Sequence, residues 1–79
     1  MPQYFFHHYN GDNQIDEVGV ELPDDAAAKI EAIRATSEML LDLSETFWSL
    51  PRYEMRVVDK NGREVCRVSC HGQIGSDGE

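Results

Sequence analysis

The fold of this chain is decided by residues 53–70, which read YEMRVVDKNGREVCRVSC. Two runs of alternating apolar and polar residues flank Asn61 and Gly62. An Asn-Gly pair between such runs is the strongest short-range signal for a β-hairpin, because both residues accept the positive φ of a tight turn. The sequence therefore predicts two antiparallel strands here.

A two-residue loop would set the register of this hairpin. It places Met55 opposite Val68. Val57 then lies opposite Cys66, so that four apolar side chains share one face. A three-residue loop would pair Met55 with Arg67 and mix apolar and charged residues on each face, so the two-residue loop is favoured. The other face then carries the polar and charged residues Glu54, Arg56, Arg67 and Ser69.

The segment before the hairpin begins with a helix start signal. Asp24 can accept a hydrogen bond from a free backbone N–H of the first turn, and Asp25 lies at the positive end of the helix dipole. The sequence therefore predicts a helix over residues 24–43. Its apolar residues form two stripes, and we expect the bulkier stripe to face the sheet. That stripe consists of Ala26, Ile30, Ile33, Ser37, Leu40 and Leu41.

The second stripe of the predicted helix is made of smaller residues. The helix propensity of alanine alone can explain it. The alternative is a contact surface, either for Phe47 and Trp48 or for another subunit. The stripe consists of Ala28, Ala32, Ala35, Met39 and Leu43.

The N-terminal part of the chain predicts two more strands. Residues 3–9 are rich in aromatic residues that favour strands, and turn-forming residues follow at 10–13. Residues 14–22 are expected to form a shorter, imperfect strand that returns beside the first, with Gly19 marking a bulge or bend. Alternation in the first strand separates two sets of side chains, Tyr4, Phe6 and His8 on one face and Phe5, His7 and Tyr9 on the other.

Together these elements predict an α+β domain with a three- to four-stranded antiparallel sheet in the order β-β-α-β-β and one long helix packed on one face. The domain is expected to span residues 1–70. The polar, glycine-rich residues 71–79 are expected to form a disordered C-terminal tail. Residues 44–52 connect the helix to the hairpin, and their side chains Phe47, Trp48 and Leu50 are expected to plug the edge of the core.

The composition is that of a small globular domain. With 79 residues and a hydrophobic fraction of 41%, the chain can form one hydrophobic core. No apolar run approaches a membrane span, and the start of the chain is unlike a secretory signal, so we expect a cytoplasmic protein. The net charge of −8 comes from residues 1–45, which hold ten acidic residues against two basic ones. This charge disfavours nucleic acid as a partner.

The positions of the cysteines and histidines in the sequence indicate no reactive site. In one strand Cys66 and Cys70 would be separated by about 13 Å, beyond the roughly 7 Å that a disulfide allows, so we expect free thiols and a reducing compartment. His7 and His8 are strand neighbours that point to opposite faces and cannot share a metal ion, and His71 has no assigned role. We expect no metal, no cofactor and no catalytic residue, and therefore no enzymatic activity.

Three stretches of the sequence resemble one known family. They are residues 1–7 (MPQYFFH), 19–24 (GVELPD) and 53–59 (YEMRVVD). On these motifs the chain resembles domain-of-unknown-function family 6894 over nearly its whole length, up to Val68. The resemblance implies a small bacterial protein, and it brings no assigned reaction, cofactor or catalytic residue.

The expected function is a non-enzymatic protein-interaction or regulatory module that forms a homodimer or binds another protein. One helix covers only one face of a sheet, while the first strand carries aromatic residues on both faces. The candidate interaction residues are Tyr4, Phe6, Met39, Leu43, Phe47 and Trp48. The alternative is a nucleic-acid or nucleotide binder that uses the basic face of the C-terminal hairpin, at Arg56 and Arg67.

Overall fold

The elements of the fold follow the predicted order, in a computed structural model that describes residues 1–75. The chain forms an antiparallel sheet and one long helix, which confirms the α+β class. In chain order the elements are strands β1 (Gln3–Tyr9), β2 (Asn13–Gln14) and β3 (Val20–Glu21), helix α1 (Asp25–Asp42), the 3-10 turn η1 (Phe47–Ser49), and strands β4 (Tyr53–Asp59) and β5 (Glu64–Cys70).

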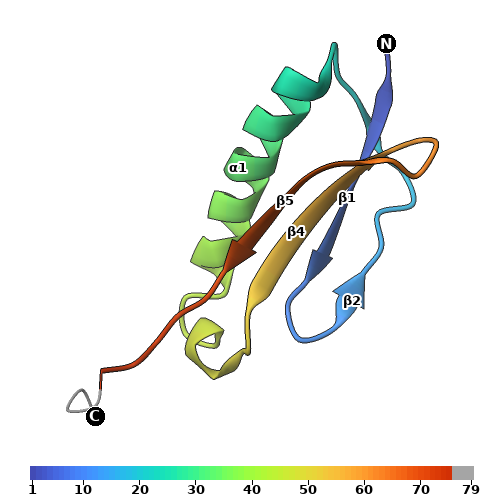
Figure 1. Cartoon of the computed structure of the whole chain (residues 1–79). Helices are drawn as coiled ribbons and strands as arrows, with labels where there is room; N and C mark the ends of the chain where they lie inside the picture. The colour runs from blue at the N-terminus through green and yellow to red at the C-terminus, as the bar shows by residue number, and fades with distance from the viewer. Residues whose placement is uncertain (76–79) are drawn as a thin grey trace.

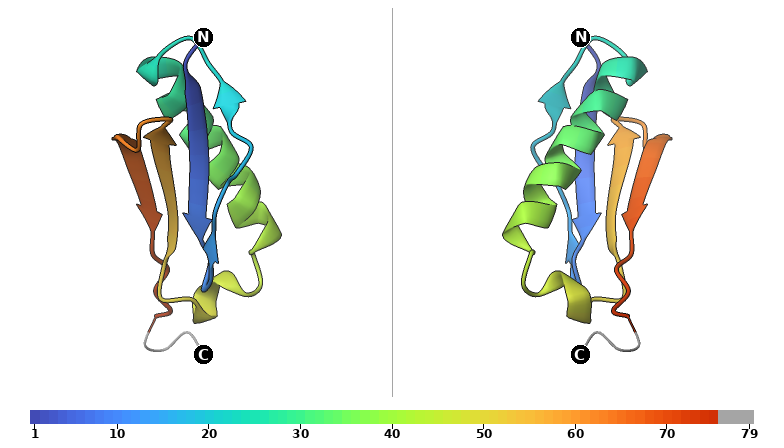
Figure 2. Two further views of the ribbon diagram at one scale, coloured as in Figure 1. Left: turned by 90° about the vertical axis from the view of Figure 1, so that its right-hand side faces the viewer. Right: turned by 90° about the vertical axis from the view of Figure 1, so that its left-hand side faces the viewer.

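The strands form one layer and α1 forms the other (Figure 1). The strand order is β2-β1-β4-β5, and β3 pairs with the start of β1 on the same edge as β2. Figure 2 shows α1 crossing one face of the sheet obliquely, with no other element of residues 1–75 on the opposite face. Of these described elements, no helix has both the length and the apolar composition that a membrane crossing needs.

The predicted strand over residues 14–22 is replaced by two short pieces. Between β2 and β3 the carboxylate of Asp16 accepts hydrogen bonds from the backbone N–H groups of Phe6, Val18 and Gly19. Midway along β1, the Asp16 carboxylate therefore accepts the hydrogen bond of Phe6 that a backbone carbonyl of a continuous neighbouring strand would otherwise accept. Gly19 has φ +80°, and a Cβ there would lie 2.8 Å from the ring of Phe5, which confirms the predicted bend.

The hairpin has the predicted register but a different loop. Met55 faces Val68, as predicted. However, the backbone N–H of Asp59 donates to the carbonyl of Arg63 at 2.9 Å, so the loop holds three residues rather than two. The side chain of Asp59 favours this wider loop, because its Oδ1 accepts the backbone N–H groups of Asn61 and Arg63.

A β-bulge in β5 allows the hairpin to have both the three-residue loop and the predicted apolar and charged faces. Near the turn Val58 faces Glu64, whereas one step further along β4 Val57 faces Cys66. Val65 is therefore left over as the extra residue of a β-bulge. The bulge restores the separation of apolar and charged faces that a three-residue loop would otherwise destroy.

The start of α1 lies where the sequence predicts it. Asp24 is extended at φ −163°, and its Oδ1 accepts the backbone N–H of Ala27 at 2.9 Å. The helix ends at Asp42, with Leu43 as its C-cap. The predicted range 24–43 is thus confirmed when both caps are counted.

The predicted orientation of the helix is wrong. The stripe of small residues faces the sheet, where Ala28, Ala32 and Thr36 are buried. The bulkier stripe faces solvent: Ile30 is 72%, Ile33 57% and Leu41 75% exposed. Of the six residues predicted to face the sheet, Leu40 alone packs against the core.

The size of the side chains on the sheet explains this reversal. The inner face of the sheet carries large buried residues from β1 and β4, namely Tyr4, Tyr53, Met55 and Val57. A helix with alanines at 28 and 32 can approach such a surface closely, so that large and small side chains interdigitate. Two bulky surfaces would be held further apart and would pack less densely.

The connector and the start of the tail lie at one end of the core. Phe47 packs partly against the core, as predicted, while Trp48 is largely exposed. Gly72 lies directly against both aromatic rings, and His71 Nδ1 is 3.2 Å from the carbonyl oxygen of Pro51. Of the predicted disordered tail, His71 and Gly72 make these contacts, and residues 76–79 lie outside the described residues.

Candidate interaction surface

The outer face of α1 is the largest exposed apolar feature of the helix. We define this outer face by Ile30, Ile33, Arg34, Ser37 and Leu41, all of which are exposed. A shallow hollow between Ile30 and Ile33 is bordered by the stems of Lys29 and Arg34. Single exposed apolar residues are common on protein surfaces, but three bulky ones on one face of a single helix are typical of a contact surface.

Arg34 supplies the polar contacts of the outer face. Its NH1 group donates to Glu38 Oε2 at 2.7 Å, and its Nε donates to Glu31 Oε1 at 3.0 Å. Both glutamates lie within one helical turn of Arg34, where side chains are neighbours. Because these pairs are solvent-exposed, they contribute little to the stability of the helix.

The six interaction residues predicted from the sequence do not form one exposed patch. Tyr4 is only 2% exposed, so its ring belongs to the core and is not available to a partner. Trp48, at 52%, presents the most surface of the six. The remaining four residues pack partly against the core: Phe6, Met39, Leu43 and Phe47.

Trp48 extends the apolar surface beyond the end of α1. Its ring meets Phe47 edge to face, with centroids 5.6 Å apart and an interplanar angle of 85°. On one side of Trp48 an apolar hollow is lined by Leu40 and Ser44. On the other side Ile74 lies beside the ring and is itself exposed.

The open face of the sheet is the face that points away from α1. It contains the predicted basic residues, but acidic residues offset their charge. Arg56 and Arg67 face each other across β4 and β5. Arg67 lies 2.6 Å from Glu64 and 3.5 Å from Glu54, and Arg56 lies 3.8 Å from Glu64. A phosphate would have to compete with these carboxylates. The face therefore lacks the uncompensated positive charge that is typical of nucleic-acid binding.

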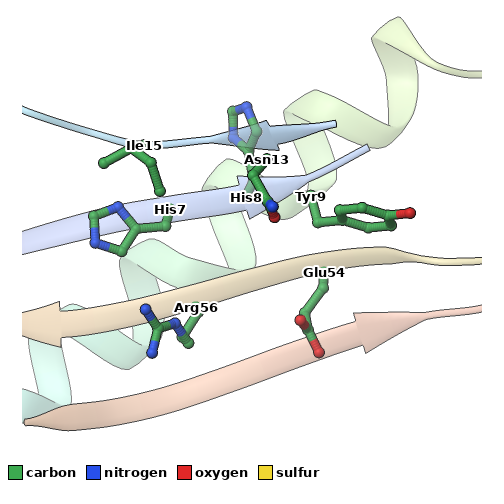
Figure 3. A pocket seen from close by; sticks show the side chains of 7 residues that line it. All are labelled: His7, His8, Tyr9, Asn13, Ile15, Glu54 and Arg56. Atoms are coloured by element: carbon green, nitrogen blue, oxygen red, sulfur yellow. The ribbon is translucent and has the colours of Figure 1, made fainter. Parts of the chain in front are cut away.

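A small hollow lies in the same open face (Figure 3). It is formed where His7 of β1 faces Arg56 of β4, beside Tyr9 and Glu54. The hollow measures about 80 Å³, well below the roughly 300 Å³ at which small-molecule sites begin. His7 Nδ1 accepts the backbone N–H of Asp16 at 3.1 Å, so the ring is held by the fold.

An arginine and an aromatic ring also stack near this hollow. The guanidinium carbon of Arg52 lies 4.8 Å from the centroid of Tyr9. Such a contact contributes about 0.5–1 kcal/mol at an exposed site. It covers one face of the Tyr9 ring.

Three titratable residues on the inner face, His8, Tyr53 and Cys66, are in environments that disfavour their charged forms. Burial lowers the pKa of His8, whose ring lies 6.1 Å from that of Tyr53, although the charge of Asp16 opposes this effect. Burial raises the pKa of Tyr53 to about 12. Burial also raises the pKa of the Cys66 thiol, which makes this cysteine a weaker nucleophile.

The cysteines and the two strand histidines lie as the sequence predicts. Cys66 and Cys70 are both free thiols, as predicted. Within residues 1–75 no three side chains of His, Cys, Asp or Glu are grouped closely enough to hold a metal ion. His7 pairs with Arg56 of the open face and His8 with the buried Met55, so the two histidines lie on opposite faces of β1, in agreement with the alternation of the strand.

Comparison with known families identifies the family to which this chain belongs. A family model described as "Domain of unknown function (DUF6894)" matches residues 3–71. The chain belongs to this family. The resemblance that the sequence motifs predicted is thereby confirmed. No curated protein and no solved structure gives a significant match.

The DUF6894 region contains both surfaces described above. The matched residues 3–71 include every helix and strand of the structure, from β1 to β5. The outer face of α1 and the open face of the sheet are therefore both parts of the family domain. The sequence identified Arg56 and Arg67 on the open face, but it assigned Ile30, Ile33 and Leu41 to the core.

Proposed function

We propose that this DUF6894 protein is a non-enzymatic protein-interaction or regulatory module that binds a protein partner through the outer face of α1. The observation that carries the proposal is the exposure of Ile30, Ile33 and Leu41 on the side of the helix that faces away from the sheet. Their burial against a partner would contribute about 25 cal/mol for each Å² of apolar surface removed from water.

Three further observations support binding rather than catalysis. The hollow in the open face of the sheet has space for little more than water or a small ion. Burial raises the pKa of the Cys66 thiol and so disfavours its nucleophilic thiolate form. By contrast, α1 is capped at Asp24 and packed through Ala28 and Ala32, so its outer face is presented on a rigid element.

We also propose that the module acts in the cytoplasm of a bacterium. The free thiols of Cys66 and Cys70 suit a reducing compartment. The motifs shared with small bacterial proteins support the same assignment.

Affinity capture with matched surface variants tests this function. The wild-type chain, Ile30→Asp and Leu41→Asp serve as baits in a lysate, and Val18→Asp is the control. Val18 is 79% exposed but lies in the segment between β2 and β3 rather than on α1. We expect the wild type and Val18→Asp to retain the same proteins and the α1 variants to lose them. Equal retention by all four baits would contradict the proposal.

A nucleic-acid or nucleotide binder is the second candidate. The observation in its favour is the row of arginines on the open face of the sheet, where Arg52, Arg56 and Arg67 accompany Tyr9. Binding to an oligonucleotide that weakens with rising salt, and that the double variant Arg56→Glu, Arg67→Glu abolishes, would favour this candidate. Protein binding that survives this double variant would favour the outer face of α1.

A further inference from the structure

We infer that the partner on the outer face of α1 is a second copy of this chain, with the two α1 helices antiparallel across a two-fold axis between Arg34 and Ser37. This inference rests on the proposed function, because it takes the outer face of α1 to be a binding surface. It adds the identity of the partner and the register of the contact.

The spacing of exposed residues along α1 forms a straight seam. Ile30, Arg34, Ser37 and Leu41 follow one another at intervals of four, three and four residues. This spacing keeps side chains on one line of a helix that faces a neighbouring helix. The four residues are exposed, and nothing in residues 1–75 covers them.

The seam is symmetric about its own midpoint. Ile30 and Leu41 lie at equal distances on either side of the midpoint between Arg34 and Ser37. In an antiparallel pair with two-fold symmetry, Ile30 therefore faces Leu41 of the partner subunit. The same contact occurs a second time by symmetry, as an isologous interface requires.

The charges of the seam are also self-complementary. Glu38 lies on the same flank of the helix as Arg34, and the two form an ion pair within one chain. The two-fold axis brings Arg34 close to Glu38 of the partner subunit, and the reverse contact follows. Arg34 can retain Glu31 of its own chain while its NH1 group turns to the partner, because these contacts use different nitrogen atoms.

The other flank of the seam is apolar and has room for a close approach. Ile33 lies there, and the symmetry places it beside the small Ser37 of the partner subunit. A large residue facing a small one allows two helices to approach to about 8–10 Å between axes. An antiparallel arrangement also sets the two helix dipoles in opposite directions, which is favourable.

The β5 edge of the sheet is a poorer site for self-association. β5 is the last strand on its side of the sheet, but it carries the charged residues Glu64 and Arg67 and a bulge at Val65. Charges and bulges on edge strands are typical devices against edge-to-edge pairing. The net charge of −8 opposes association in general, whereas on the seam the charges of Arg34 and Glu38 cancel.

Analytical ultracentrifugation tests whether the chain pairs through this seam. We expect the purified chain to change from its monomer mass of 9.0 kDa to twice that mass as concentration rises into the high micromolar range. Ile30→Asp and Leu41→Asp should each raise the dimer dissociation constant about thirtyfold or more, because each places a charge at the centre of a buried contact. The control Val18→Asp should dimerise like the wild type.

Mixing two charge-reversal variants tests the antiparallel register. Arg34→Glu alone and Glu38→Arg alone should each dimerise weakly, since each places like charges opposite one another. An equimolar mixture should form heterodimers, because the two reversed positions then meet residues of opposite charge in the partner. Mixing cannot restore the pair within either chain, so recovery shows a contact between chains.

The outcomes separate this inference from the proposed function. A wild type that remains monomeric at all concentrations would overturn the inference, and the affinity capture would then still decide whether α1 binds a different protein. A dimer that survives Ile30→Asp and Leu41→Asp would overturn the inference as well. A dimer that these variants abolish, but that the mixed charge reversals do not recover, would overturn the antiparallel register.

Discussion

The hydroxyl of Tyr4 donates a 2.8 Å hydrogen bond to Asp25 Oδ1 and so joins β1 to the first residue of α1. The same carboxylate accepts hydrogen bonds from Arg63, at 3.2 and 3.0 Å. Arg63 also binds the side chain of Asp59, which shapes the hairpin loop. Three segments that are distant in sequence therefore meet at one carboxylate, beside the end of the core opposite Trp48.

Tyr4→Phe tests the contribution of this junction. The variant keeps the buried ring but removes the hydrogen bond to Asp25, so we expect a lower urea midpoint with an unchanged m-value. Tyr9→Phe is the matched control, since it removes a hydroxyl from the same strand without touching Asp25. Equal midpoints for the two variants would show that the Tyr4 hydroxyl adds no stability.

The junction also predicts a dependence of stability on pH. The hydrogen bond from Tyr4, followed by those from Arg63, holds the pKa of Asp25 below its ordinary value of 3.8. A carboxyl with a depressed folded pKa adds stability above its unfolded pKa, and this stability is lost as pH falls through the folded pKa.

We therefore expect Asp25→Asn to be less stable than the wild type at pH 7. The difference should shrink as the pH falls below 3.8, because the wild-type carboxyl then becomes neutral as well. Thermal unfolding of both proteins between neutral and strongly acidic pH measures this difference. A gap of constant size across the whole range would show that the charge of Asp25 is not responsible.

The orientation of α1 can be tested by paired substitutions on its two faces. Ala32→Leu adds bulk against the sheet and should cost about 1–3 kcal/mol of unfolding free energy. Ile30→Ala removes an exposed side chain and should change the stability of the monomer by less than about 0.5 kcal/mol. Chemical denaturation at low protein concentration, where the monomer dominates, gives both values. The opposite ranking would show that the bulkier stripe faces the sheet after all.

The hairpin loop makes a prediction about Gly62. This residue has φ +85°, which a residue with a Cβ adopts at a cost of about 1–2 kcal/mol. Gly62→Ala should therefore lower the unfolding free energy by that amount, although nothing surrounds the position that a methyl group would meet. Gly75→Ala is the control, since that position is equally open and has no positive φ. Equal stabilities would argue against the observed turn.

Local patterns in the sequence were sufficient for the first strand, the helix and the two hairpin strands, and for most of the hairpin register. The start of α1 follows from Asp24, whose carboxylate needs only the backbone of its own first turn. The pairing of Met55 with Val68 follows from alternation along the two strands. The loop was mispredicted because the hydrogen bonds of Asp59 favour three residues and a bulge then restores the faces.

The candidate interaction surface could not be predicted from the sequence, because contacts outside the helix decide which of its faces is buried. Both stripes of α1 are apolar, and the sequence of the helix does not indicate which of them packs against the sheet. The sequence therefore pointed to Trp48, which is exposed, but also to Tyr4, which is buried, and it missed Ile30 and Leu41.

The sequence by itself determined where the helix and hairpin begin and which hairpin residues share a face, because these depend on neighbours within a few residues or on strict alternation. The tertiary structure alone decided which side of α1 is buried. That choice depends on the bulk of Tyr53, Met55 and Val57 on the sheet, against which only the alanine side of the helix can pack closely. The same packing leaves Ile30, Ile33 and Leu41 in solvent.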